Sequence, residues 1–162
     1  NNVPVHKGDV FFIESGTLHA IGKGILIAEI QQNSNTTYRV YDYGRVGKDG
    51  KPRELHIEKA IDVTELCPPK YDTKPQGKPV KIDGGEETLL RSCEYFDVHK
   101  IKVSGTVTLD ADEKSFMSVL VLDGSGKIGE LDAKKGDSFF VPAGYGRFTL
   151  TGNLEVILSD IV

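Results

Sequence analysis

The stretch that decides the fold is GDVFFIESGTLHAIGKG, residues 8–24, because its pattern returns later in the chain. KGDVFFIESGTLHAIGKGILIAEI begins at Lys7, and KGDSFFVPAGYGRFTLTGNLEVIL begins at Lys135, an offset of 128 residues. Lys-Gly-Asp, Phe-Phe and a later glycine coincide in the two copies, as do the apolar strands that follow. A pattern that recurs at a fixed offset indicates repeated structural units. We therefore predict two related β units.

Short apolar or alternating runs, separated by Gly or Asp-Gly, indicate an all-β protein with one short helix. The runs expected to form strands are DVFFIE (9–14), GILIAEIQ (24–31), TYRVYDY (37–43), FDVHKIKV (96–103), FMSVLVLD (116–123), DSFFVP (137–142), RFTLTG (147–152) and LEVILSDIV (154–162). In PRELHIEKAIDVT, Leu55, Ala60 and Ile61 have roughly helical spacing, which predicts a helix near residues 53–62. Residues 67–87, rich in Pro and Gly, are expected to form a linker or strap.

Charge and cysteine content argue against several classes of protein. The formal net charge of −4 provides no basic surface for a phosphate backbone, so we expect no nucleic-acid partner. No apolar run approaches the roughly eighteen residues of a membrane span, and the opening NNVPVHKGD lacks the features of a signal peptide. Two cysteines, Cys67 and Cys93, are too few for a disulfide-stapled secreted domain. We expect free thiols in a cytoplasmic protein without a membrane partner.

The glycine and histidine spacing of the first copy resembles the second sequence motif of the cupin barrels. Gly8, Gly16 and His19 stand in its positions, and the second copy has Arg147 where the first has His19. The first glycine turns the chain into a strand, the second ends that strand, and the residue three further on points into the barrel mouth. The resemblance implies two cupin (double-stranded β-helix or jelly-roll) units. The second is expected to be degenerate, because a guanidinium is always protonated and cannot bind a metal.

Residues 3 to about 64 resemble one family of cupin enzymes more closely. GTLHAIGKGILIAEIQQNSNTTYRVYDYGR and DGKPRELHIEKAIDV are similar to the catalytic domain of the type I mannose-6-phosphate isomerases, in their shorter bacterial form. The resemblance implies an isomerase that interconverts mannose 6-phosphate and fructose 6-phosphate, with one zinc ion held by a Gln, two His and a Glu. It also implies a C-terminal half: residues 1–66 belong to the catalytic cupin, which lacks its N-terminal half, 67–87 form the linker, and 88–162 form the degenerate cupin.

The resemblance assigns roles to two residues. His19 matches the family's last zinc ligand, and Arg39 matches its active-site arginine. The remaining ligands are expected upstream of Asn1, so the fragment is expected to be inactive alone. Zinc can act as a Lewis acid on sugar oxygens, and Arg39 would stabilise the anionic intermediate of the aldose–ketose isomerisation. Alternation along residues 37–43 places Arg39 on a face with Thr and Tyr, which suits a polar sugar cavity.

Four other polar residues are weaker candidates for binding the expected partner, a phosphorylated hexose. Glu29 lines the same pocket or, equally, lies on a solvated strand, and Gln31 hydrogen-bonds sugar hydroxyls or merely closes a loop. Arg53 and Lys59 are candidates for contacting the phosphate from the short helix. The β edges left open by the absent half also make association between chains plausible, because unpaired edges tend to pair.

The sequence leaves two alternatives open. The chain could be a non-catalytic sugar- or metal-binding cupin module, although it holds no complete ligand set. It could also be another cupin enzyme, such as a dioxygenase with a two-His site, whose other ligands would equally lie outside the chain. The long similarity over residues 16–63 argues against the second alternative.

Overall fold

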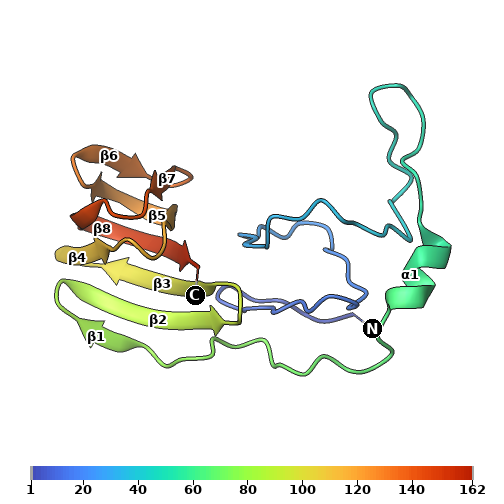
Figure 1. Ribbon diagram of the computed structural model, residues 1–162, viewed down its shortest axis with the longest axis horizontal. Coiled ribbons are helices and arrows are strands. Elements are labelled where there is room, and N and C mark those ends of the chain that lie inside the picture. Colours follow the sequence, from blue (N-terminus) through green and yellow to red (C-terminus); the bar gives the residue numbers. More distant parts are fainter. Residues whose placement is uncertain (1, 162) are drawn as a thin grey trace. The chain divides into compact units, whose positions relative to one another are not determined.

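The computed structural model describes residues 2–161 of the 162-residue chain, which divide into two compact units (Figure 1). One unit comprises residues 1–11 and 73–162, and the other comprises residues 12–72. All the strands of the described residues lie in the first unit, and the only helix lies in the second. The protein is therefore mostly β with one short helix, as predicted.

Eight antiparallel strands build the first unit (Figure 1). They are β1 (Val80–Ile82), β2 (Gly85–Ser92), β3 (Asp97–Val103), β4 (Thr106–Ala111), β5 (Met117–Ile128), β6 (Leu131–Lys134), β7 (Ser138–Val141) and β8 (Gly146–Asp160). The sheet order is β1-β2-β3-β8-β5-β6, with β4 also paired to β8 and β7 to β5. The long strand β8 pairs with β4 through residues 146–151, and with both β3 and β5 through residues 154–160.

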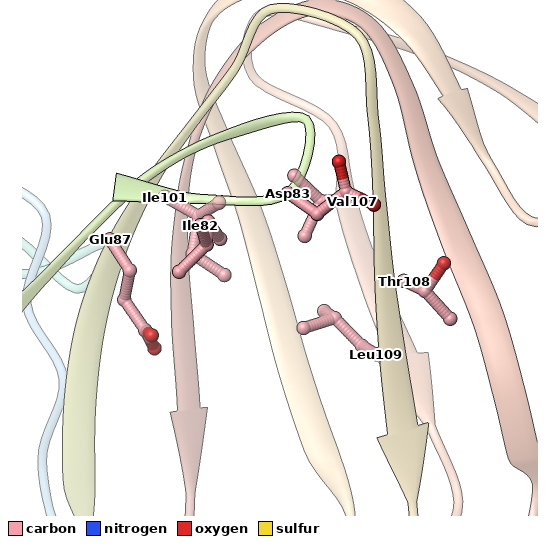
Figure 2. A pocket seen from close by; sticks show the side chains of 7 residues that line it. All are labelled: Ile82, Asp83, Glu87, Ile101, Val107, Thr108 and Leu109. Carbon is pink, nitrogen blue, oxygen red and sulfur yellow. The ribbon is translucent and has the colours of Figure 1, made fainter. Parts of the chain in front are cut away.

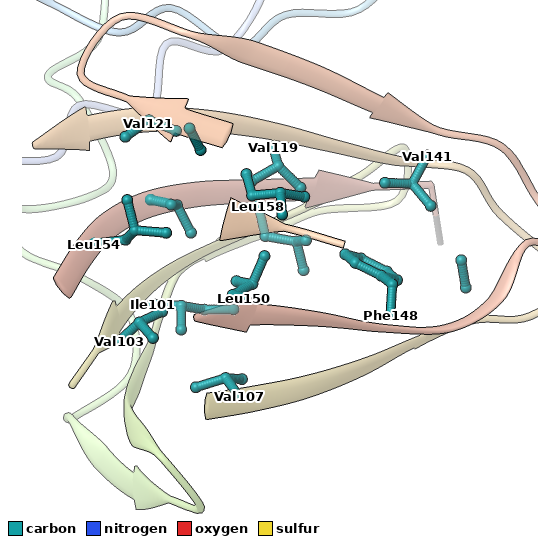
Figure 3. Packing of buried hydrophobic residues seen from close by; sticks show 14 residues of the cluster. Ile101, Val103, Val107, Val119, Val121, Val141, Phe148, Leu150, Leu154 and Leu158 are labelled. Atoms are coloured by element: carbon teal, nitrogen blue, oxygen red, sulfur yellow. The ribbon is translucent and has the colours of Figure 1, made fainter. Parts of the chain in front are cut away.

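The strands predicted in the second half of the chain are confirmed. Segments 96–103, 116–123 and 137–142 become β3, β5 and β7, and the two last predicted runs merge into β8. Alternate side chains of these strands form one hydrophobic core (Figure 3). Ile101, Leu150 and Val156 have no solvent exposure within it. Burial of such side chains contributes about 1.5–3 kcal/mol each, so this core is the main source of stability of the unit.

The helix begins later than predicted. Helix α1 spans Ile57–Val63, whereas the sequence pattern placed its start near residue 53. Residues 53–56 lie outside the helix, and His56 bonds to another segment: its N–H donates to the Arg39 carbonyl at 2.7 Å, and the Arg39 N–H donates to His56 Nδ1 at 3.1 Å. No helix among the described residues is long and apolar enough to cross a membrane.

The strands predicted in the first half of the chain are not formed. Residues 2–79 contain no strand, only an isolated bridge between Val46 and Pro52. Segments 9–14, 24–31 and 37–43 have strand-like sequences, but a strand forms only where a second segment satisfies its N–H and C=O groups. Their apolar side chains also stay exposed, among them Leu26 at 93%, as does Leu18 at 64% in the intervening turn. Exposed apolar surface of this extent is typical of a region that packs against a partner.

The repeated sequence has the same local backbone in both copies. Gly8 and Gly136 have φ angles of 97° and 91°, and Gly16 and Gly144 have 85° and 73°. These angles lie in the left-handed region that glycine adopts without steric cost. In each copy the residue after the second glycine donates its N–H to the carbonyl three residues earlier, at 3.1 and 3.2 Å. The repeat is therefore present in the turns as well as in the sequence.

The turn before the first glycine is also shared. The Asp9 carboxylate accepts the N–H of His6 at 2.8 Å, and the Asp137 carboxylate accepts the N–H of Lys134 at 2.9 Å. Each aspartate also donates its own N–H to the carbonyl of that same residue, Asp9 to His6 at 3.1 Å and Asp137 to Lys134 at 3.0 Å. The shared aspartate of the Lys-Gly-Asp motif thus closes the turn that leads into the following segment.

Candidate functional site

A buried carboxylate organises the polar residues of the second unit. Asp42 is 8% exposed and accepts two hydrogen bonds from the Arg53 guanidinium, one of them from Nε at 2.6 Å. Arg39 Nε lies 3.9 Å from Asp42 Oδ1. The hydrogen-bonded Arg53 holds the pKa of Asp42 below its usual range, against the opposing effect of burial. Asp42 therefore remains ionised and holds the two arginines together; these three residues are called the Asp42 cluster.

Arg39 is fixed by several contacts within this unit. Its Nη1 donates to the Glu54 carbonyl at 3.2 Å, and its main chain bonds to His56. Its side chain is 22% exposed, so part of the guanidinium is accessible. Since Arg53 already neutralises Asp42, the cluster carries an excess positive charge that resides on Arg39. An arginine held this way is suited to an anionic group.

His19 lies on an exposed turn rather than in a closed metal site. Its Nδ1 lies 2.9 Å from the Thr17 carbonyl, which favours a proton on Nδ1 and a lone pair on Nε2. The preceding turn requires glycine, because a Cβ on Gly16 would lie 2.8 Å from the Val63 carbonyl oxygen and φ is 85°. Among the described residues, no group of three or more metal-ligating side chains includes His19. The residues present therefore do not complete a zinc site.

The other candidate residues are not bonded to His19 or to Arg39. Three of them are exposed: Glu29, Gln31 and Lys59. Among the described residues, no hydrogen bond or ion pair joins these three to His19 or to the Asp42 cluster. Arg53, expected on the helix, instead precedes it and pairs with Asp42. Sequence reasoning missed Asp42, because its acidic side chain lies within a tyrosine-rich run whose alternation favoured the opposite face.

The β unit contains a cavity and a second group of polar residues. The cavity, of about 230 Å³, has three polar lining residues, Asp83, Glu87 and Thr108, among apolar ones (Figure 2). Elsewhere in the same unit, Asp97, His99 and Asp160 bring potential ligand atoms within 4.8 Å of one another. The sequence pattern gave no indication of this grouping.

Comparison with known proteins finds similarity to one family. Residues 85–161 match the family described as mannose-6-phosphate isomerase, cupin domain. The chain is 44% identical to mannose-6-phosphate isomerase ManA of Bacillus subtilis over 98% of its own length and 51% of that protein. It is 40% identical to the mannose-6-phosphate isomerase of Streptococcus mutans, over 97% of the chain and 50% of that protein.

A solved structure agrees with these matches. The crystal structure of the mannose 6-phosphate isomerase from Bacillus subtilis has a TM-score of 0.66 and 36% sequence identity, covering 79% of this chain and 41% of that one. The chain spans about half the length of the curated relatives it matches. The match nevertheless extends over almost the entire chain, across both units. The chain is therefore similar to the mannose-6-phosphate isomerases over almost its whole length, and to about half the length of those relatives.

Proposed function

We propose that this chain is the C-terminal half of a cytoplasmic, zinc-dependent mannose-6-phosphate isomerase, and that it is inactive alone. The complete enzyme would interconvert mannose 6-phosphate and fructose 6-phosphate. The observation that carries the proposal is the 44% identity over 98% of the chain, combined with coverage of only 51% of the relative. The two cysteines, which are free in the structure, suit a reducing compartment.

The proposed organisation is a chain of two related cupin units. Residues 1–66 would be the C-terminal part of the catalytic cupin and 88–162 the second, degenerate cupin. The linker expected over 67–87 is shorter than predicted, because strand β1 (Val80–Ile82) and the start of β2 (Gly85–Ser92) already belong to the sheet of the β unit. The matching glycine angles and turn hydrogen bonds at an offset of 128 residues support a common origin of the two units. The Arg147 side chain at the position of His19 supports the loss of metal binding at that position in the second copy.

The absent half would supply the strand partners of residues 12–72. Segments 24–31 and 37–43 have the composition of strands, yet they are unpaired and leave apolar side chains exposed. Pairing them with an N-terminal half would satisfy their backbone groups and cover those side chains in one step. The same open edges would let two copies of this chain associate when the N-terminal half is missing.

The proposed catalytic roles use His19 and Arg39. His19 would offer Nε2 as the last zinc ligand, and the remaining ligands would come from the N-terminal half. Isomerisation moves a proton between C2 and C1 of the sugar through an anionic enediolate, and Arg39 would stabilise that charge. Asp42 and Arg53 would position Arg39, and Glu29, Gln31 and Lys59 remain candidates for contacts with the sugar phosphate.

The test is an isomerase assay on a polypeptide that joins the N-terminal half of Bacillus subtilis ManA to this chain. We expect turnover of mannose 6-phosphate by the joined protein and none by the chain alone. His19→Ala should abolish turnover and reduce the zinc content, whereas Arg39→Ala should reduce turnover alone. A joined protein that folds, as judged by circular dichroism, and binds zinc but does not isomerise the sugar would contradict the proposal and favour a binding module.

A further inference from the structure

Two strands of the β unit bring three ionisable side chains to one place on their core-facing side. Asp97 and Asp160 are directly opposite each other in the β3–β8 pairing, and His99 follows Asp97 by two residues, on the same face. The next residue along this face of β3 is Ile101, and the preceding one on β8 is Leu158, both members of the hydrophobic core. One potential ligand atom from each of the three residues lies within 4.8 Å of the other two.

These side chains contain buried polar atoms that make no hydrogen bond within the described protein. Asp97 Oδ1, His99 Nδ1 and Asp160 Oδ1 are fully buried and make no hydrogen bond. No ion pair of the described residues joins Asp97 or Asp160 to a lysine or arginine. Two facing carboxylates without a cation repel each other, and buried polar atoms without partners cost free energy. A bound cation would remove the repulsion and would give the two buried carboxylate oxygens a partner.

A fourth side chain would orient the histidine. Glu87 Oε1 lies 2.9 Å from His99 Nδ1, although the two groups are not aligned for a hydrogen bond. A carboxylate beside one ring nitrogen favours the proton there and leaves the lone pair of the other nitrogen for a metal. Glu87 also lines the cavity of about 230 Å³ (Figure 2).

We propose that Asp97, His99 and Asp160 bind one divalent transition-metal cation inside the β unit. Two carboxylates balance the charge of such an ion, and the neutral imidazole favours Mn²⁺ or Zn²⁺ over Mg²⁺ and Ca²⁺, which prefer oxygen ligands alone. Glu87 is a positioning residue. Because the ligands come from the outer ends of β3 and β8, the ion holds these two strands together. This site lies on other residues than His19, so it does not depend on the proposed isomerase activity.

The test is calorimetric titration of the 162-residue chain with Mn²⁺ and with Zn²⁺, accompanied by thermal unfolding. We expect one bound ion per chain and a rise in Tm, since a ligand that binds only the folded state stabilises it. Asp160→Asn keeps the shape of the side chain and removes its charge, so it should weaken binding about tenfold or more. The same variant should raise the Tm of the metal-free protein, because it removes the repulsion with Asp97.

Two control variants show whether the metal binds at these three side chains. Asp123→Asn alters an exposed carboxylate of β5, which lies 3.5 Å from Lys135, and should leave binding unchanged. His19→Ala should also leave it unchanged, whereas loss of binding in that variant would assign the metal to the proposed isomerase site instead. Unchanged binding in Asp160→Asn, a lower metal-free Tm in that variant, or the absence of saturable binding would each overturn the proposal.

Discussion

The substitution Leu150→Ala tests whether the β unit depends on its hydrophobic core. Leu150 has no solvent exposure and lies on the central strand β8. The change removes three carbon groups, whose transfer to water costs about 0.8 kcal/mol each, and it leaves a cavity that the surrounding strands cannot fill completely. The total expected loss is about 3–5 kcal/mol. For a domain of this size, each kcal/mol lowers Tm by about 4–8 °C, so the midpoint should fall by at least about 12 °C.

The assay is thermal and urea unfolding of the chain, followed by circular dichroism. Leu131→Ala is the matched control, because the same side chain on β6 is 63% exposed, and exposed substitutions usually change stability by less than about 0.5 kcal/mol. Equal losses in the two variants, or a loss below about 1 kcal/mol for Leu150→Ala, would refute the placement of Leu150 in a close-packed core.

Three further predictions follow from single sites. Gly126→Ala should destabilise the β unit much more than Gly129→Ala in chemical unfolding, because a Cβ at Gly126 would lie 1.9 Å from the Thr151 carbonyl oxygen, whereas the space at Gly129 is open and only its φ of 57° is strained. In the complete enzyme, Arg39→Ala should lower turnover about 10²–10³-fold while metal analysis finds the zinc content unchanged; loss of zinc would make Arg39 a structural residue. The Asp42–Arg53 pair lowers the pKa of Asp42 below 3.8, so its stabilising effect should be present above that pH and disappear as the pH falls through the lowered value. An acid titration of Tm should therefore be flatter for Asp42→Asn than for the unchanged protein.

The sequence pattern predicted four of the eight strands of the β unit, β3, β5, β7 and β8, whereas β1, β2, β4 and β6 were not singled out. Residues 96–103 largely alternate apolar and polar side chains, residues 116–123 form an apolar run, and both segments pair with β8. Local pattern and tertiary context therefore agree for them. The helix start was misplaced because the two hydrogen bonds between Arg39 and His56, one of them to the His56 side chain, hold this residue against another segment. No local pattern contains that long-range information.

The candidate sites were predictable only in part, for a similar reason. The motif spacing singled out His19, and the resemblance to the isomerase family singled out Arg39. Neither indicated Asp42, whose importance depends on burial and on an arginine eleven residues away. The group of Asp97, His99 and Asp160 is invisible in the sequence, because it forms only when the end of β8 lies beside the start of β3. The pairing of two segments so far apart in the sequence depends on the order of the strands in the whole sheet.

The central claim is that residues 12–72 are part of a barrel completed by an N-terminal half, and amide hydrogen exchange tests it most directly. The exchange of segments 24–31 and 37–43 would be measured in the chain alone and in the polypeptide joined to the N-terminal half of Bacillus subtilis ManA. We expect rapid exchange in the chain alone and strong protection in the joined protein, with strands β3, β5 and β8 protected in both. Equal protection of the two segments in both proteins would show that they are already satisfied within this chain, and would contradict the claim.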